Sequence, residues 1–309
     1  MRAAAARVYL PDAEAFSPEC RGELSRMRRL TRSRGEATAI FVRVGTRVDA
    51  AMLAGFPKLR AVFSATTGVD HIDLAACAAR SVAIFSLRGR TAFLRRLPNT
   101  AEHSFALLLA LYRNLPEAFE AVKRGRWEQT PFRGRTLAGK RFGIVGFGRL
   151  GRIAASIARG FGMSLSAYDP HVRTMPAYIT RVRTLTQLAR SVDVLSIYAS
   201  LVPETIGLID ARVLAAMKPE AVLVNVARGQ IVDEAALLDA LRRGAIAGAA
   251  LDVLADEASA GDPGHSVIRE ARRLRNLIIT PHIGGQTFEA VVQADRHILD
   301  LFAKWEGGK

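Results

Sequence analysis

The sequence has only two cysteines, Cys20 and Cys77, and they lie far apart. Such a pair provides neither a disulfide framework nor the closely spaced thiolates of a metal site, and it fits a reducing compartment. No apolar run approaches the length of a membrane span. At the N-terminus, Arg7 interrupts the alanines before a signal-peptide core develops. We therefore expect a soluble cytoplasmic protein with no metal site and no membrane association.

Acidic residues are scarce relative to basic ones, and the formal net charge is +15. A nucleic-acid-binding protein needs such charge gathered on one face. Here the arginines form dispersed clusters without interleaved aromatic residues, so nucleic-acid binding is the weaker alternative and a basic cleft for small anionic substrates is favoured. The clusters span residues 21–34, 88–96, 124–135 and 269–275.

The length of 309 residues predicts two domains, each large enough to bury a core. In the first hundred residues, short apolar runs alternate with helical stretches, which is the βαβ pattern of a parallel sheet. We expect strands at 8–10, 39–44, 59–64 and 82–85, and helices at 48–53 and 73–79. Residues 86–98 are expected to be irregular and basic. A strongly apolar helix then follows, which Thr100 can cap and which should lie at the junction between domains.

From Lys140 the β/α rhythm restarts and is more regular. Short apolar runs predict further strands, and the stretches between them predict helices. The expected strands are 141–145, 164–168, 192–198, 221–226, 248–253 and 277–280. The expected helices are 149–160, 184–190, 210–217, 233–243 and 287–305.

A glycine-rich loop, Gly146-x-Gly148-x-x-Gly151, follows the first of these strands and opens a helix. In a dinucleotide fold the first glycine permits a tight turn, the second admits the pyrophosphate, and the third allows close packing of helix and strand. Asp169 ends the next strand, where a carboxylate can accept hydrogen bonds from the adenosine ribose. A carboxylate there repels the extra phosphate of NADP, although Arg173 could partly compensate. NAD is therefore the favoured cofactor.

Polar residues follow three later strands: Arg228, Glu257 and His282. Because ligands of a parallel α/β sheet bind beyond the carboxyl ends of its strands, these residues can meet in one crevice. Arg228 can present its guanidinium to a substrate carboxylate or carbonyl. His282 can exchange a proton as hydride moves, and Glu257 can hold the imidazole and favour its protonated form. Asp252 is placed for the nicotinamide end of the cofactor.

The remaining histidines have no comparable setting. His103 lies in the apolar helix and is expected to be structural. His297 lies in the last helix and is expected to face solvent. The other histidines are His71, His171 and His265.

These residues resemble the D-isomer-specific 2-hydroxyacid dehydrogenase family, and the likeness covers almost the whole chain. Several motifs of high specificity carry it together. They are Thr67-Gly68-Val69-Asp70-His71-Ile72-Asp73, Thr100-Ala101-Glu102-His103, Leu137-Ala138-Gly139-Lys140, Val202-Pro203-Glu204-Thr205, Met217-Lys218-Pro219, Val224-Asn225-Val226-Ala227-Arg228-Gly229, Ala250-Leu251-Asp252-Val253 and Thr280-Pro281-His282-Ile283-Gly284-Gly285.

The resemblance implies that Arg228 binds substrate and that Glu257 and His282 form the acid–base pair. It further implies backbone donors to the substrate carboxylate at Thr67, Gly68 and Val69. The implied cofactor-binding residues are Gly146, Gly148, Arg149, Leu150, Gly151, Asp169, Ser200, Thr205, Ala227, Asp252, Gly284 and Gly285.

The implied fold is α/β, with two Rossmann-like domains that each contain a parallel sheet. The substrate domain is flavodoxin-like and discontinuous, over residues 1–103 and 282–309, and an NAD-binding Rossmann domain over residues 104–281 is inserted into it. A homodimer is implied, with contacts from the cofactor domain, the apolar helix and the segment 86–98. That segment resembles a phosphoglycerate-dehydrogenase-like branch. Since no regulatory domain follows residue 309, regulation by serine through such a domain is not expected.

The sequence departs from the family at several positions. Tyr198 stands where histidine is common, Ser200 and Val202 replace proline and threonine, Ala258 replaces a proline, and Thr66 replaces a glycine of the substrate loop. None of these changes removes a reactive group. They bear on cofactor affinity and substrate fit and leave the reaction class unchanged.

The sequence thus predicts an NAD-dependent oxidoreductase that interconverts a D-2-hydroxy acid and a 2-keto acid. The alternative is a binding protein of the same fold that senses a dinucleotide and docks partner proteins. The choice of substrate depends on the loops near residues 43–47, 66–70 and 86–98. A charged substrate tail could meet Arg43, Arg88 or Arg90, but a surface position is expected for each.

Overall fold

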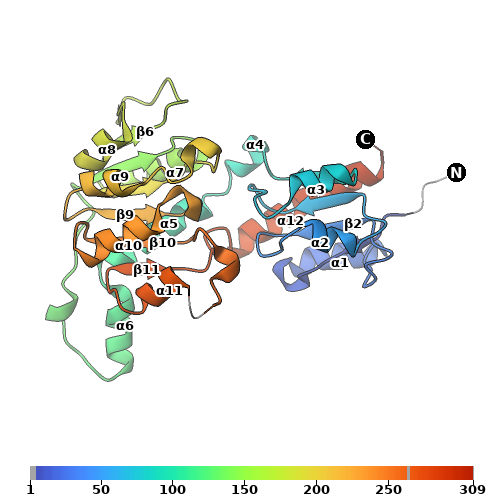
Figure 1. Cartoon of the computed structure of the whole chain (residues 1–309), viewed down its shortest axis with the longest axis horizontal. Coiled ribbons are helices and arrows are strands. Elements are labelled where there is room, and N and C mark those ends of the chain that lie inside the picture. The colour runs from blue at the N-terminus through green and yellow to red at the C-terminus, as the bar shows by residue number, and fades with distance from the viewer. Residues whose placement is uncertain (1–4, 263–264, 309) are drawn as a thin grey trace. The chain divides into compact units, whose positions relative to one another are not determined.

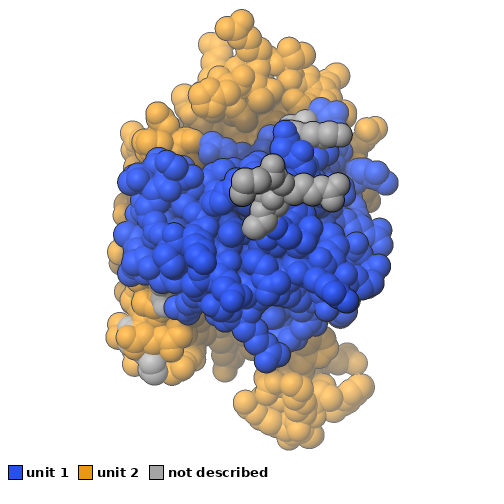
Figure 2. Space-filling view, turned by 90° about the vertical axis from the view of Figure 1, so that its right-hand side faces the viewer, with its two compact units in different colours: residues 1–97, 286–309 blue, residues 98–285 orange. Residues whose placement is uncertain are grey.

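The computed structural model describes residues 5–262 and 265–308, without the side chains of Thr91 and Ala258. It contains two compact units: residues 1–97 with 286–309 form unit 1, and residues 98–285 form unit 2 (Figure 2). The chain passes between the units after residues 97 and 285, where the sequence suggested 103 and 281. Each unit contains a parallel sheet, so the predicted α/β class is confirmed.

Unit 1 has a four-stranded sheet of order β1-β2-β3-β4. Figure 1 labels its strand β2 and its helices. Side chains of a strand alternate between its two faces. In β2, Phe41 therefore packs with α1 and α12, and Ile40 packs with α2 and α3. The strands are β1 (Val8–Tyr9), β2 (Ala39–Val42), β3 (Ala61–Ser64) and β4 (Ala83–Ser86), and the helices are α1 (Pro18–Arg26), α2 (Ala50–Ala54), α3 (Leu74–Ala79), α4 (Thr91–Leu94) and α12 (Phe288–Glu306).

Helix α12 attaches the end of the chain to unit 1. The ring of Phe302 lies 5.6 Å from those of Phe41 and Phe63, and it is fully buried. Burial of such a side chain contributes about 1.5–3 kcal/mol to stability. Asp295 is also buried, and it accepts a hydrogen bond from the Ser17 N–H at 2.7 Å and pairs with Arg43. The expectation that Arg43 lies at the surface is therefore wrong.

The segment 86–98 is less irregular than expected, because it contains the single-turn helix α4. Phe93 of α4 stacks on His297 of α12, with ring centroids 4.7 Å apart and planes at 14°. The Nε2 atom of His297 is buried. The expectation that His297 faces solvent is therefore wrong.

Unit 2 has a seven-stranded parallel sheet of order β11-β10-β9-β8-β5-β6-β7. The strand β7 was not predicted, because it has three residues and two of them, Thr180 and Arg181, are exposed. The predicted strands are all present; β5 and β6 have the predicted bounds, and β8 to β11 have somewhat narrower ones. They are β5 (Arg141–Val145), β6 (Ser164–Tyr168), β7 (Ile179–Arg181), β8 (Val194–Ile197), β9 (Val222–Asn225), β10 (Gly248–Leu251) and β11 (Leu277–Ile279).

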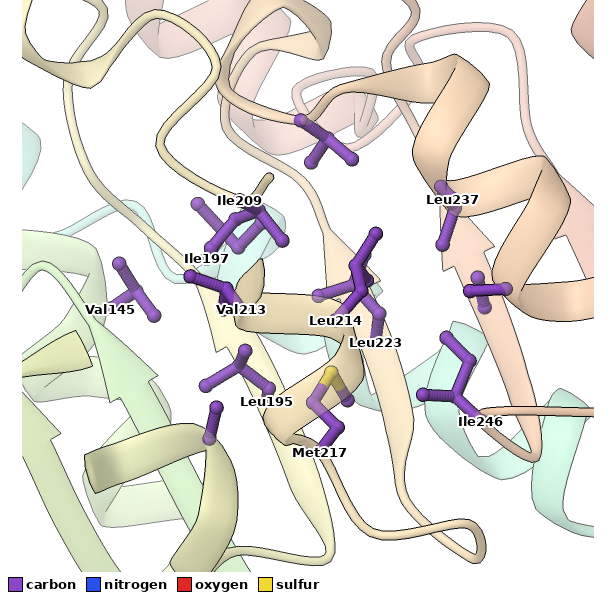
Figure 3. Close-up of a cluster of buried hydrophobic side chains, with 14 of the residues drawn as sticks. Val145, Leu195, Ile197, Ile209, Val213, Leu214, Met217, Leu223, Leu237 and Ile246 are labelled. Atoms are coloured by element: carbon purple, nitrogen blue, oxygen red, sulfur yellow. The ribbon is translucent and has the colours of Figure 1, made fainter. Parts of the chain in front are cut away.

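Helices cover both faces of this sheet, and its central strands are buried throughout. In β8, Leu195 and Ile197 pack with α8, α9 and α10, whereas Val194 packs with α5 and α7. Figure 3 shows the first of these two cores, with Val213 and Leu214 of α9 beside the strand residues. The helices are α5 (Asn99–Tyr112), α6 (Leu115–Lys123), α7 (Arg149–Gly160), α8 (Leu185–Ser191), α9 (Ala211–Ala216), α10 (Glu234–Arg242) and α11 (Ser266–Ala271).

Helix α5 starts two residues earlier than expected, at Asn99. Pro98 occupies its N-cap position, so the prediction that Thr100 caps the helix is wrong. The Thr100 hydroxyl instead donates to the carbonyl oxygen of Gly284 at 3.2 Å, and the Asn99 amide donates to the same oxygen at 2.9 Å. The start of α5 therefore holds the loop that follows β11. Among the described helices, none is long and apolar enough to cross a membrane.

Candidate active site

The glycine loop lies at the point where the strand order reverses, since β5 has β6 on one side and β8 on the other. Gly146 has a φ of +90°, and a Cβ there would lie 2.6 Å from the backbone nitrogen of Ala199. A Cβ on Gly151 would lie 2.2 Å from the Gly146 oxygen. At Gly148 a Cβ would meet nothing within 4 Å. The first and third glycines are thus needed for packing, and the second leaves open space at the N-terminus of α7.

That open space fits the pyrophosphate of a dinucleotide, because the first turn of a helix offers free N–H groups and a positive dipole end. Arg149 and Leu150 are the first residues of α7, and both are half-buried. Burial lowers the pKa of the Arg149 guanidinium, which nevertheless stays charged at neutral pH. The residues present therefore suit an anionic group at this place.

Asp169 follows β6 and ties two loops together. Its Oδ2 accepts a hydrogen bond from the Phe147 N–H at 2.8 Å, and its Oδ1 accepts from the N–H groups of His171 and Val172 at 2.9 and 3.2 Å. The carboxylate is thus held next to the glycine loop by the backbone. This position suits an acceptor for ribose hydroxyls.

The loop after β8 carries two predicted cofactor-binding residues, Ser200 and Thr205, and two further departures from the family, Tyr198 and Val202. The Thr205 hydroxyl donates to the Ser200 carbonyl oxygen at 2.8 Å and accepts from the Val202 N–H at 2.9 Å, so it closes this loop on itself. Tyr198 is buried, and its hydroxyl lies 2.7 Å from that of Ser104 on α5. Burial raises the pKa of Tyr198 to about 12. The tyrosine is therefore a neutral packing residue behind the glycine loop.

Arg228 lies just beyond β9, in a turn shaped by the buried residue Asn225. The Asn225 amide donates to the Arg228 carbonyl oxygen at 2.9 Å, and its oxygen accepts from the Ala227 N–H at 3.0 Å. The sequence analysis gave Asn225 no role. The available signal was a polar residue at the end of a strand that is otherwise apolar.

The turn after β9 packs directly on the segment after β10. A Cβ on Gly229 would lie only 1.9 Å from the Leu254 carbonyl carbon. The Gln230 amide donates to the Ala255 oxygen, and Glu234 accepts from the Ala255 N–H, both at 2.7 Å. These contacts fix the segment that leads to Glu257.

His282 and Glu257 are in contact. The imidazole Nδ1–H donates to Glu257 Oε2 at 2.8 Å, and both side chains are partly exposed. His282 also has a φ of 54°, a left-handed conformation that is costly for any residue with a Cβ. Its backbone N–H donates to the Asp252 carbonyl oxygen at 2.8 Å. With Nδ1 held by the carboxylate, Nε2 is the ring nitrogen left for a substrate.

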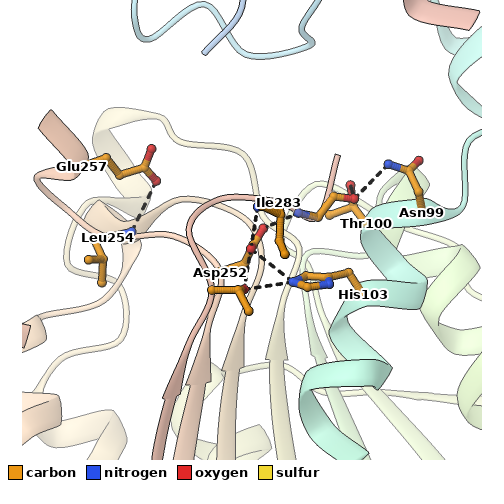
Figure 4. A network of polar contacts seen from close by, with 9 residues as sticks. Asn99, Thr100, His103, Asp252, Leu254, Glu257 and Ile283 are labelled. Carbon is orange, nitrogen blue, oxygen red and sulfur yellow. Dashed lines mark hydrogen bonds and ion pairs between the residues drawn. The ribbon is translucent and has the colours of Figure 1, made fainter. Parts of the chain in front are cut away.

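The Asp252 carboxylate lies at the centre of a polar network that shapes the loop after β11 (Figure 4). Its Oδ1 accepts from the Thr280 hydroxyl at 2.6 Å and the Ile283 N–H at 2.8 Å, and its Oδ2 accepts from the Gly284 N–H at 2.8 Å. His103 Nε2 lies 3.2 Å from Oδ1. Burial would raise the pKa of Asp252, but these hydrogen bonds outweigh it and lower that pKa.

Asp252 therefore holds the loop that carries His282. Sequence reasoning assigned Asp252 to the cofactor and missed its partners His103 and Thr280. At Gly284 a Cβ would lie 2.8 Å from Asp252 Oδ2, so this glycine is required by the network.

The predicted substrate loop, with Thr67, Gly68 and Val69, follows β3 in unit 1. Among the described residues, none accepts a hydrogen bond from the N–H groups of these three residues. Successive free N–H groups can bind an anion. Arg228, Glu257 and His282 instead follow the three neighbouring strands β9, β10 and β11 of unit 2.

Comparison with known proteins gives the family. The model for "D-isomer specific 2-hydroxyacid dehydrogenase, NAD binding domain" matches residues 105–284, which is more than half of the chain. The chain belongs to the D-isomer specific 2-hydroxyacid dehydrogenase family. Its unit 2 accordingly contains the NAD-binding domain of that family, and the expected family and cofactor are confirmed.

Relatives differ in length and in cofactor. The D-3-phosphoglycerate dehydrogenase of Mycobacterium tuberculosis is 38% identical over 267 residues, 86% of this chain and 48% of its own length. A Polaromonas protein assigned to the D-isomer specific 2-hydroxyacid dehydrogenases has a TM-score of 0.85 and 27% identity, with 99% and 98% coverage. An NADPH-dependent glyoxylate/hydroxypyruvate reductase of Sinorhizobium meliloti has a TM-score of 0.79 and 25% identity, with 98% and 94% coverage. The chain thus spans about half the length of the curated relatives it matches.

Proposed function

We propose that this chain is an NAD-dependent oxidoreductase that interconverts a D-2-hydroxy acid and a 2-keto acid. The observation that carries the proposal is the hydrogen bond of 2.8 Å between His282 Nδ1 and Glu257 Oε2, at the carboxyl edge of the sheet that contains the glycine loop. A carboxylate that orients an imidazole is the arrangement of a general acid–base catalyst. The family membership of the chain supports the same reaction class.

NAD, when bound, supplies or accepts the hydride at the substrate C2. In the reductive direction His282 Nε2 gives a proton to the carbonyl oxygen as C2 receives hydride, and in the oxidative direction it removes the hydroxyl proton. Glu257 accepts the Nδ1–H at 2.8 Å and so orients the ring, which leaves Nε2 for the proton transfer. The guanidinium of Arg228 binds the substrate and polarises its carbonyl.

The substrate is proposed to be a small anion. The N–H groups of Thr67, Gly68 and Val69, for which the described residues provide no acceptor, suit its carboxylate. The net charge of +15 favours the approach of an anion. Asp169, held beside the glycine loop, supports NAD over NADP, since its charge repels a 2′-phosphate.

The test is reduction of a panel of keto acids with NADH: glyoxylate, hydroxypyruvate, pyruvate, 2-ketoglutarate and phosphohydroxypyruvate. His282→Gln should lower kcat by about a hundredfold or more, the size of a general-acid contribution. Glu257→Gln should also lower kcat, because the imidazole loses the carboxylate that accepts its Nδ1–H at 2.8 Å and orients the ring.

The exposed Glu19 in α1 offers a matched control, since Glu19→Gln should leave kcat unchanged. Retention of most turnover by His282→Gln would remove that residue from the proton transfer. Tight NADH binding with no turnover of any keto acid would favour the dinucleotide-sensing alternative.

We further propose that the protein is a cytoplasmic homodimer. Both cysteines are buried and unpaired, which suits a reducing compartment. Exposed apolar side chains on and after α6 support a second copy as the partner. They are Phe119, Val122 and Trp127.

A further inference from the structure

A chain of side-chain hydrogen bonds runs under the loop that follows β3. The Thr66 hydroxyl donates to the Gly68 carbonyl oxygen at 2.7 Å. The Ser64 hydroxyl lies 2.7 Å from that of Thr66, and His71 Nε2 lies 3.1 Å from Ser64 Oγ. Ser64 is fully buried at the end of β3, and Thr66 is half-buried. The loop therefore has an internal polar support that reaches from the sheet to Gly68.

The Gly68 carbonyl oxygen at one end determines which atom is the donor in each of these hydrogen bonds. A carbonyl oxygen can only accept, so Thr66 must be the donor to Gly68. Its oxygen is then the acceptor for Ser64, whose own oxygen accepts from His71 Nε2–H. Both the Nε2–H neutral tautomer and the imidazolium supply that proton, so the chain is compatible with either charge state of His71.

The hydrogen bond from Thr66 to the Gly68 carbonyl oxygen fixes the orientation of one peptide group. The C=O of Gly68 and the N–H of Val69 belong to the same planar trans peptide, so they point in opposite directions. When Thr66 holds the carbonyl beneath the loop, the Val69 N–H is turned outward. This N–H is one of the three without a partner among the described residues. Thr66 thus determines where a donor of the proposed anion site points.

We infer that Thr66 is a positioning residue for the substrate carboxylate, acting through the Gly68–Val69 peptide; the inference rests on the proposed function. In this chain the loop is ordered before the substrate binds, which lowers the entropic cost of binding. Loss of the hydroxyl should weaken substrate binding more than it slows the chemical step.

Steady-state kinetics with NADH and a turned-over keto acid test the inference, using Thr66→Val, which keeps the side-chain shape, and Thr66→Ser, which keeps the hydroxyl. Loss of one hydrogen bond should raise KM roughly three- to tenfold in Thr66→Val with kcat within about twofold. Thr66→Ser should restore KM. The exposed Thr180 on β7 supplies the control, since Thr180→Val should change neither constant.

Amide hydrogen exchange of peptides covering residues 65–72 gives a readout independent of activity. Exchange should be faster than in the wild type for Thr66→Val, and unchanged for Thr66→Ser and Thr180→Val. If exchange in Thr66→Val is unchanged, the Thr66 hydroxyl does not stabilise the loop. If exchange is faster but KM is unchanged, the hydroxyl stabilises the loop and has no role in substrate binding. An equal fall of kcat in Thr66→Val would also count against positioning of the bound substrate. If the wild type reduces no keto acid, the proposed function fails, and the exchange data alone decide whether Thr66 holds the loop.

Discussion

Single residues in this protein act mainly by holding other residues in place. Asp252 is 1% exposed and accepts hydrogen bonds from the groups around the loop of His282. The loop needs this support because His282 has a φ of 54°, and a left-handed conformation costs about 1–2 kcal/mol outside glycine. Positioning of a reactive group by a buried carboxylate explains why Asp252 lies so close to the proposed acid–base pair.

Replacement of Asp252 by Asn should destabilise the protein and slow turnover. Asn keeps the shape but has one acceptor oxygen for several donors, so at least one buried donor loses its partner, at about 1–3 kcal/mol. Urea unfolding and kcat measure the two effects. Because the pKa of Asp252 is lowered from its ordinary value of 3.8, the stabilisation is full above that pH and is lost as pH falls further.

Asp239 on α10, which forms an exposed ion pair with Arg243, is the control for this change. Asp239→Asn should have little effect on the free energy of unfolding or on kcat. Normal stability together with normal turnover in Asp252→Asn would show that the network does not position His282.

At the scale of elements, the packing of α4 on α12 depends on a neutral histidine. The ring of His297 stacks on Phe93, and its Nε2 is buried. Burial first, and then the charge of Arg90, lower the pKa of His297. Asp300 acts in the opposite direction, and Lys304 adds a smaller lowering. Protonation of this imidazole therefore opposes the folded state of unit 1.

Stability of the wild type should fall as pH drops below 6.5, the ordinary pKa of the imidazole. The sign follows because the folded pKa lies below the unfolded one, so the unfolded state binds the proton more tightly in that range. His297→Phe keeps the ring stack and removes the titration, so its stability should depend less on pH. Urea unfolding at pH 7.5 and 5.5 gives the comparison.

The exposed His171 provides a control, because His171→Phe should retain the pH dependence of the wild type. Equal pH dependence in His297→Phe and the wild type would mean that the buried imidazole does not govern this response.

At the scale of the whole molecule, the exposed apolar side chains of unit 2 suit contact with a second copy. Trp127 is 84% exposed and Phe119 63% exposed. Large apolar side chains grouped on a surface commonly mark an interface. If the homodimer forms here, each copy covers these side chains of the other.

The double variant Phe119→Glu with Trp127→Glu should convert the dimer into a monomer, because burial of two carboxylates in an interface is strongly unfavourable. Light scattering after size-exclusion chromatography should give twice 33.5 kDa for the wild type and 33.5 kDa for the variant. Phe288→Glu, at a single side chain that is 92% exposed in unit 1, should remain dimeric. A wild type with the monomer mass of 33.5 kDa, or a double variant that stays dimeric, would contradict the assignment of this surface as the dimer interface.

Much of the fold follows from local sequence. Alternation of apolar runs with helical stretches predicts the strands β5 to β11 except β7. The signal is strongest for β5, β8, β9 and β10, which bury all or nearly all of their residues between two helical layers. Helices with few buried residues escape such reasoning. Helix α1 buries only Cys20 and Leu24, so its apolar pattern is too weak to predict.

The sequence by itself determined the residue types and their order: three glycines before a helix, and an arginine, a glutamate and a histidine after successive strands. Parallel pairing then brings these chain-distant residues to one sheet edge. Only the tertiary structure decided which side chains meet. The partners His103 and Asp252, Asn225 and Arg228, and Thr66 and Gly68 depend on loop conformation and burial. Such contacts leave no periodic pattern in the sequence, because each arises from the packing of loops rather than from the repeat of a helix or strand.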